Sequence, residues 1–196
     1  MNHQLSDREN IEIIPYQMVW NDQFLKAKSD LANALGDLYA QIEHIGSTAV
    51  EGLSSKNRID IQIGVQEINE QTCLDINQRL SCLGLDNAFL SSDHLPPGEN
   101  NKEEWEKIYL KGYSKEWDFQ ANIHIRKIGA KNYEYALLFR DFLRVNEEAR
   151  LLYERNPFSN KGKIVSLVLD KMSGGENIRF SNNNQKEYID KRSEEH

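Results

Sequence analysis

The segments IEHIGSTAV at residues 42–50 and RIDIQIGV at residues 58–65 decide the fold that the sequence predicts. Both alternate apolar with polar residues, the pattern of a β-strand with one buried face. The first breaks at Gly46-Ser47, and the second brings Asp60 to the start of a neighbouring strand. Backbone N–H groups beside a carboxylate suit phosphate and a divalent cation, as phosphoryl or nucleotidyl transfer requires. A tight strand–turn–helix junction with an ordinary strand-end aspartate explains the pattern equally well.

The composition describes one ordinary domain with an acidic balance. The 196 residues hold 24 Lys and Arg against 31 Asp and Glu, a net charge of −7. Because nucleic acids and anionic membranes attract clustered Lys and Arg, we expect neither as a general partner. The sequence has no run of about 18 apolar residues, so we expect no membrane-spanning helix. The oligomeric state stays open.

Two features predict a cytoplasmic protein. The start MNHQLSD has neither the basic residues nor the apolar stretch of a signal peptide. Cys73 and Cys82 lie nine residues apart in one predicted helix, on opposite faces and too far apart for a disulfide. Two unpaired thiols suit a reducing compartment.

Hydrophobic periodicity and turn residues predict helices and strands in alternation. The expected strands cover residues 38–45, 59–65, 86–90, 108–113 and 119–128, the last two as a hairpin, and residues 11–14 form a short edge strand. The expected helices cover 21–35, capped by Asn21, a turn at 48–53, 67–83, 132–145, capped by Asn132, 147–155 and 159–172. Residues 91–101 read as a long loop, the kind of segment that is often functional or mobile.

This order predicts an α+β fold, a mixed sheet with helices mainly on one face plus C-terminal helices. We expect residues 11–175 to form a single domain. Residues 1–10 are expected to be disordered, and residues 176–196 are expected to form a polar, flexible tail.

Polar side chains gather on one predicted face of the sheet. Alternation puts Asp60 and Gln62 on the face to which His124 and Arg126 also point, and we expect this face to be open. Lys56 and Arg58 precede Asp60 closely, and Gly46-Ser47 lies at the edge. One carboxylate, one imidazole, three cations and a loop of backbone donors suit a polyanionic ligand.

Each of these residues also has a structural explanation. Lys56 and Arg58 suit a solvated turn, and His124 suits a hydrogen-bonded position in the strand. Arg140 and Arg144 flank Asp141 on one helix face, so surface ion pairs explain them at least as well as ligand binding. Of the neighbours Glu43 and His44, only one can face the site.

The central motif resembles the signature of the GrpB-like family. The matching stretches are EHIGSTAV at 43–50, Gly52-Leu53, Lys56, IDI at 59–61, Pro15-Tyr16 with Trp20, IHI at 123–125 and FRDFLR at 139–144, over roughly residues 11–155. The family in turn resembles the polymerase-beta-type nucleotidyltransferases. That resemblance implies that Gly46-Ser47 holds phosphates and that Asp60 belongs to a set of carboxylates for two Mg²⁺ ions. Here Gln62 stands at the second carboxylate position, and the later strand offers Asn122 and His124 in place of an acid.

The resemblance leads to a first hypothesis, Mg²⁺-dependent nucleotidyl or phosphoryl transfer on a nucleotide or other small phosphorylated molecule. Asp60 and His124 are the expected catalytic residues, with Asp60 and Gln62 at the metal. The residues expected to bind phosphate or nucleotide are Gly46, Ser47, Thr48, Lys56, Arg58, Arg126 and Arg140.

The second hypothesis is a nucleotide- or CoA-precursor-binding module without turnover, since GrpB-like domains occur joined to dephospho-CoA kinase. The third is an interaction protein with no small ligand.

Overall fold

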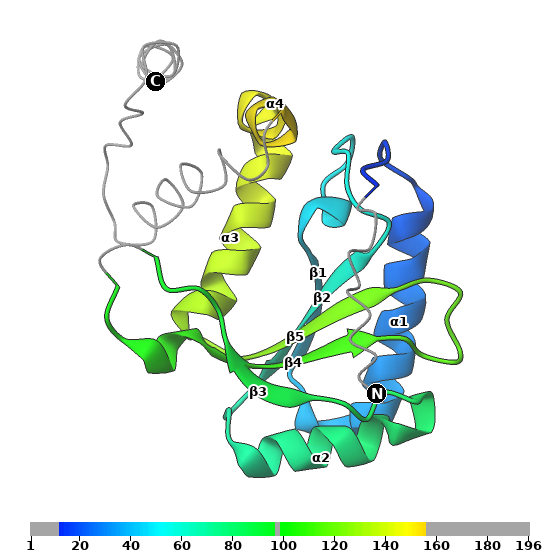
Figure 1. Cartoon of the computed structure of the whole chain (residues 1–196), viewed down its shortest axis with the longest axis vertical. Helices are drawn as coiled ribbons and strands as arrows, with labels where there is room; N and C mark the ends of the chain where they lie inside the picture. The colour runs from blue at the N-terminus through cyan, green and yellow to red at the C-terminus, as the bar shows by residue number, and fades with distance from the viewer. Residues whose placement is uncertain (1–11, 97–98, 156–196) are drawn as a thin grey trace, which may run out of the picture.

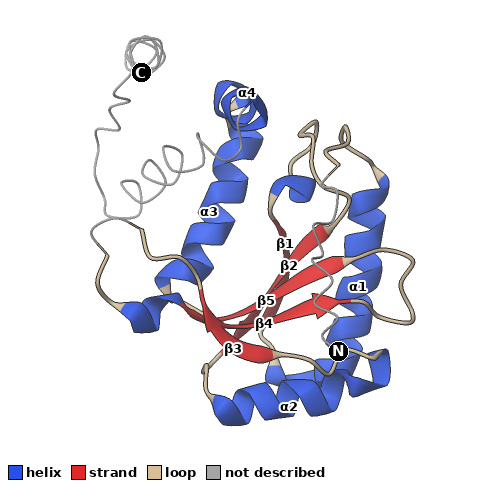
Figure 2. Ribbon diagram, in the orientation of Figure 1, coloured by secondary structure: helices blue, strands red, loops and turns tan. Residues whose placement is uncertain are grey.

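A five-stranded mixed sheet forms the centre of the protein, as the computed structural model shows for residues 12–96 and 99–155 (Figures 1 and 2). The strand order is β1-β2-β5-β4-β3. β2 and β5 run parallel, and the other neighbours are antiparallel. The strands are β1 (Gln41–Ile45), β2 (Ile59–Val65), β3 (Phe89–Ser92), β4 (Glu106–Gly112) and β5 (Ala121–Lys127).

Helices cover both faces of this sheet. The helices α1 (Val19–Leu35) and α2 (Glu70–Leu80) pack against one face, and α3 (Lys131–Val145), followed by α4 (Glu147–Arg155), lies on the other (Figure 1). The predicted fold class, an α+β mixed sheet with helices mainly on one face plus C-terminal helices, is confirmed, and it is the C-terminal α3 that covers the second face. Among the described residues, no helix is long and apolar enough to span a bilayer.

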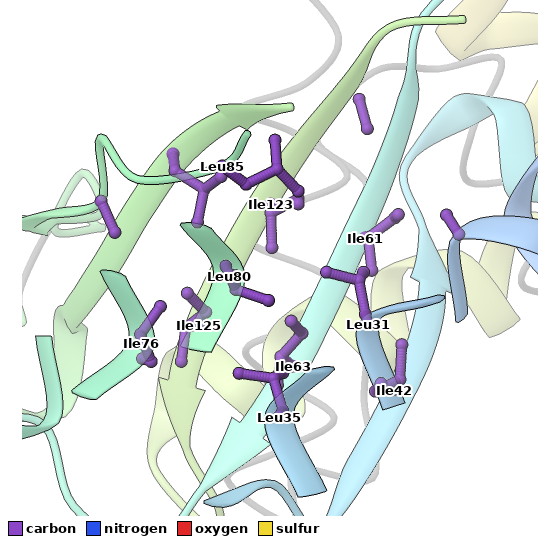
Figure 3. Close-up of a cluster of buried hydrophobic side chains, with 14 of the residues drawn as sticks. Leu31, Leu35, Ile42, Ile61, Ile63, Ile76, Leu80, Leu85, Ile123 and Ile125 are labelled. Atoms are coloured by element: carbon purple, nitrogen blue, oxygen red, sulfur yellow. The ribbon is translucent and has the colours of Figure 1, made fainter. Parts of the chain in front are cut away.

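The main core lies between the sheet and the helices α1 and α2 (Figure 3). Every second residue of β2 and β5 points into it, and all of these isoleucines are fully buried: Ile59, Ile61, Ile63, Ile123 and Ile125. The helix α1 adds an apolar stripe at helical spacing. Because alternate residues of a strand point to opposite faces, this core fixes the polar residues between the isoleucines on the other face.

Several predicted boundaries move by a few residues. The first strand begins at Gln41, because residues 36–38 form a 3₁₀ turn after α1. The strand predicted at 86–90 is β3, which begins later and includes Ser91 and Ser92, the first two residues of the predicted loop. The hairpin is confirmed as β4 and β5, and residues 11–14 contribute only an isolated bridge between Ile14 and Ser55.

Both predicted asparagine caps are wrong. The helix α1 begins at Val19, so Asn21 lies inside its first turn. Asn132 also lies inside a helix, and its side-chain amide donates to Asp93 and to the Glu106 carbonyl. The predicted helix at 159–172, the segment 1–10 and the tail lie outside the described residues.

Candidate functional site

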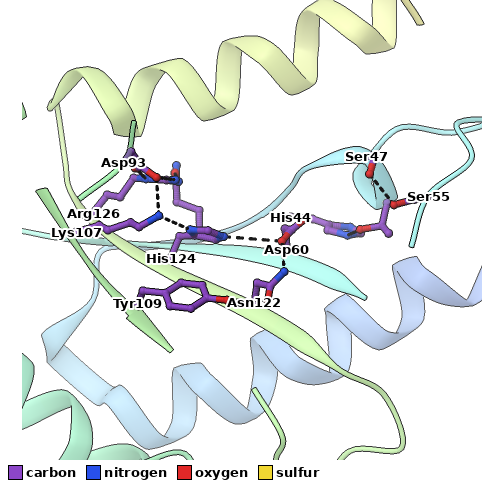
Figure 4. Close-up of polar contacts among 12 residues, drawn as sticks. His44, Ser47, Ser55, Asp60, Asp93, Lys107, Tyr109, Asn122, His124 and Arg126 are labelled. Carbon is purple, nitrogen blue, oxygen red and sulfur yellow. Dashed lines mark hydrogen bonds and ion pairs between the residues drawn. The ribbon is translucent and has the colours of Figure 1, made fainter. Parts of the chain in front are cut away.

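The register of the sheet collects polar side chains on the face opposite the main core. Asp60 on β2 lies beside Asn122 on β5, and Gln62 lies beside His124. On β4, Tyr109 lies beside His124. Figure 4 shows these side chains with His124 between the carboxylate of Asp60 and the ammonium of Lys107. The predicted grouping of Asp60, Gln62, His124 and Arg126 on one face is therefore what the structure shows.

Asp60 is held by three neighbours. The Asn122 amide donates to Oδ1 at 2.8 Å, and His124 Nε2 lies 3.8 Å from the same oxygen. The backbone of Gly46 packs so closely that a Cβ there would lie 2.4 Å from Oδ2. Burial would raise the pKa of Asp60, but His124 and Asn122 hold it below its ordinary value. The carboxylate is therefore ionised, with 27 % of the side chain exposed.

His124 has a defined tautomer. Lys107 Nζ lies 3.4 Å from its Nδ1. Because an ammonium group has only donors, Nδ1 accepts, and in the neutral ring Nε2 carries the proton toward Asp60. Burial lowers the pKa of His124 below its ordinary value, and the opposing effect of Asp60 does not restore it. His124 is thus neutral near pH 7, with its Nε2–H turned toward Asp60 at 3.8 Å.

Gln62 and Arg126 share this face but are not exposed on it. The Gln62 amide donates to the Tyr133 carbonyl of α3 at 3.2 Å, and its oxygen accepts from Arg126. Gln62 is 0 % exposed and Arg126 is 6 % exposed. The expectation of an open face is wrong here, because α3 covers this end of the strands.

The carboxylate that pairs with Arg126 belongs to Asp93, a residue that the sequence analysis did not single out. It accepts from Arg126 Nε at 2.8 Å and from Lys107 Nζ at 2.5 Å. Asn132 also donates to it, at 3.1 Å. Burial would raise the pKa of Asp93, but the charges of Arg126 and Lys107 hold it well below its ordinary value. Asp93 follows β3 in a loop, and no local pattern marks it.

The hydroxyl groups in the turn after β1 contact neighbouring side chains of the protein. The Ser47 and Ser55 hydroxyls are 2.6 Å apart. Thr48 is 2 % exposed, and its hydroxyl lies 3.0 Å from His44 Nε2. The side chain of Thr48 therefore points inward, and its hydroxyl is not placed to meet the phosphate that we expected there. The N–H groups of Ser47 and Thr48 begin a 3₁₀ turn and have no partner within it.

Glu43, not His44, faces the site. His44 points to the other side, where its ring stacks on Phe24 at a centroid distance of 4.7 Å. Burial lowers the pKa of His44 to about 4. Arg140 on α3 donates to Glu43 Oε2 at 2.8 Å, to Asp141 at 2.8 Å and to the His44 carbonyl at 2.9 Å. These contacts tie α3 to β1 and occupy the guanidinium that we expected at a phosphate.

Three cations lie at or just before the end of the sheet that carries Asp60, here called the Asp60 edge. Lys56 is exposed and precedes β2, and Arg58 donates to Gln120 through Nε at 3.1 Å. Lys111 lies beside Asn122 on β4 and is exposed. Sequence reasoning missed Lys111, because its face depends on the register of the hairpin.

The oxygen donors fit one Mg²⁺ ion better than two. No group of three His, Cys, Asp or Glu suited to a metal occurs within residues 12–96 and 99–155. The oxygens of Gln62 and Asn122 already accept from Arg126 and the Tyr109 hydroxyl. Mg²⁺ commonly uses one or two carboxylates together with waters and substrate phosphates. Asp60 suits such a shared ion, whereas a two-ion site lacks its second carboxylate.

Comparison with known proteins places the sequence in a family. Residues 10–157 match the family described as GrpB protein. The chain belongs to the GrpB family. A UPF0157 protein of Streptomyces coelicolor is 28 % identical over 147 residues, covering 74 % of this chain and 67 % of that protein. A dephospho-CoA kinase of Mycobacterium bovis is 27 % identical over 168 residues. That match covers 76 % of this chain but only 40 % of the kinase.

One solved structure of a GrpB protein shares the fold of this chain. The crystal structure of GrpB from Enterococcus faecalis aligns with a TM-score of 0.60 and 21 % identity, covering 83 % of this chain and 99 % of that one. A cytoplasmic RNA terminal U-transferase aligns with a TM-score of 0.48 and 15 % identity, over 76 % of this chain and 43 % of that one.

Proposed function

We propose that this GrpB domain binds a nucleotide or a related phosphorylated small molecule as its Mg²⁺ complex. The observation that carries the proposal is the setting of Asp60, an ionised and partly exposed carboxylate against the backbone of Gly46. Lys56, Arg58 and Lys111 lie at the same edge of the sheet. Bound Mg²⁺ would offset the charge of the phosphates, and these cations would add to that effect.

Binding without two-ion transfer fits the side chains best. Nucleotidyl or phosphoryl transfer through two ions needs a second carboxylate near Asp60, and the residues in register with Asp60 are Ile45 and Asn122. Glu43, an acid on the same face, is paired with Arg140. His124 Nδ1 accepts from Lys107, so a role as general base is also disfavoured.

CoA precursors belong among the ligands to be tested. One relative of this chain is a dephospho-CoA kinase, in which the match covers 40 % of the length. A shared domain is an analogy and does not assign that kinase's substrate to this chain. Dephospho-CoA nevertheless combines an adenine nucleotide with a phosphate chain, the chemistry that the Asp60 edge suits.

A thermal-shift panel tests the proposal. The protein is heated with nucleotides and with dephospho-CoA, each in Mg²⁺ and in EDTA, and the mixtures are analysed for turnover. A ligand at about 100 times its dissociation constant adds about 2.7 kcal/mol to stability, a shift of several degrees. We expect a Mg²⁺-dependent shift that Asp60→Asn removes and that Asp75→Asn on α2, on the other side of the sheet, retains.

The outcomes separate the three hypotheses. A Mg²⁺-dependent shift without turnover supports the proposal, and turnover would favour the transferase. A shift that is equal in EDTA and survives Asp60→Asn would contradict the role of Asp60. No shift with any ligand would favour an interaction protein.

A further inference from the structure

Two aromatic side chains extend the polar face beyond His124. Tyr109 on β4 lies beside His124, with ring centroids 5.3 Å apart. Phe89 on β3 lies beside Tyr109, with centroids 5.8 Å apart and planes at 81°. Because partners in register point to the same face, Phe89, Tyr109 and His124 form one row that leads from the sheet edge toward Asp60.

Phe89 is unusually open for its size. Its exposed fraction is 53 %, and it stands on the outermost strand of the sheet. Two perpendicular rings form a corner in which a flat ring can stack on one and meet the edge of the other. Lys107 Nζ lies 5.4 Å from the Tyr109 ring centroid, and its charge is paired with the carboxylate of Asp93.

The corner is connected to the Asp60 edge. The Tyr109 hydroxyl donates to Asn122 Oδ1 at 2.9 Å, and the Asn122 amide donates to Asp60. Lys111 follows Tyr109 by two residues on the same face, a separation of about 7 Å along the strand. A ligand with its flat ring at the corner could therefore place an anionic group beside Lys111.

We propose that Phe89 and Tyr109 form the surface that receives the base of the nucleotide. The proposal rests on nucleotide binding at the Asp60 edge and adds the part of the ligand that the corner recognises. A flat aromatic base on the corner and phosphates toward Lys111 match the charges of this face. Stacking on an aromatic side chain is available to every base, so this surface selects nucleotides over bare phosphates and discriminates little among bases.

Binding measurements on wild type and two alanine variants test this inference. Phe89→Ala removes the exposed ring, and Leu90→Ala is the matched control, since Leu90 is its neighbour, points to the opposite face and is 43 % exposed. The probes are ATP, UTP and inorganic tripolyphosphate, each with Mg²⁺. We expect Phe89→Ala to weaken ATP and UTP by about 5- to 150-fold and to leave tripolyphosphate unchanged. Leu90→Ala should change none of them, and equal melting temperatures will show that both variants fold.

The failures are distinguishable. If wild type binds ATP and Phe89→Ala binds it equally well, the base surface is refuted and nucleotide binding stands. If wild type binds tripolyphosphate as tightly as ATP, the base makes no contact and this inference again fails alone. If wild type binds none of the three probes, both proposals fail.

Discussion

Replacing Gly46 by Ala should destabilise the protein more than a substitution at any ordinary loop glycine. Gly46 has φ 72° and ψ −173°, a conformation that is essentially restricted to glycine. A new Cβ would lie 2.4 Å from Asp60 Oδ2 and 3.0 Å from Asp60 Cβ. The backbone strain contributes roughly 1–3 kcal/mol, and the overpacking contributes roughly another 1–3 kcal/mol.

Gly52→Ala provides the matched control. Gly52 also has positive φ, 79°, but a Cβ there meets no atom within 4 Å. It therefore tests the backbone penalty alone, of about 1–2 kcal/mol. Gly46→Ala should exceed it by at least about 1 kcal/mol, since it adds the contact with Asp60.

Urea denaturation of five proteins, Gly52→Ala among them, measures both effects. Wild type, Gly46→Ala, Asp60→Ala and the double variant form a cycle, in which removal of the Asp60 carboxylate should recover part of the cost of Gly46→Ala. The reasoning is refuted if Gly46→Ala costs no more than Gly52→Ala, or if the two changes in the cycle are additive.

Asp93→Ala should lower the free energy of unfolding by about 3–5 kcal/mol, because it leaves the buried Arg126 without a carboxylate; urea denaturation measures this, and a loss below about 1 kcal/mol would contradict it. Because the folded pKa of Asp93 is depressed, its contribution should be present above pH 3.8 and lost as the pH falls below that value. The contribution of His44 to stability should change over a higher pH range than that of Asp93, since its folded pKa of about 4 lies below its ordinary 6.5. Its contribution is complete above pH 6.5 and falls by roughly 3 kcal/mol as the pH approaches 4. Urea denaturation at several pH values should therefore show that the free energy of unfolding of His44→Gln depends less on pH between 4 and 6.5 than that of wild type. An unchanged pH dependence would refute the assignment. Asn122→Asp should place a second carboxylate beside Asp60 and lower the melting temperature in EDTA, with Mg²⁺ raising it more than in wild type; equal Mg²⁺ shifts would refute that expectation.

Strand periodicity predicted the central part of the fold well. The alternation in β2 and β5 is strong because one face of each strand is buried, so the grouping of Asp60 with His124 followed from the sequence. The helix ends at Gly36 and Gly84 were also readable, since each carries positive φ at the end of a helical segment.

What sequence reasoning missed depends on how elements pack. The contact of Asp93 with Arg126 joins a loop to a strand 33 positions later in the chain. The burial of Gln62 follows from the docking of α3, which strand periodicity cannot reveal. Asn132 has the composition of a cap, but its amide bonds to Asp93 and the Glu106 carbonyl instead.

Calorimetric titration with ATP is the most direct test of the account, carried out on wild type and Asp60→Asn in Mg²⁺ and in EDTA. The account predicts that wild type binds ATP more tightly in Mg²⁺ than in EDTA, and that Asp60→Asn loses this difference while it remains folded. Binding that is equal in Mg²⁺ and EDTA, or a Mg²⁺ effect that persists in Asp60→Asn, would contradict it.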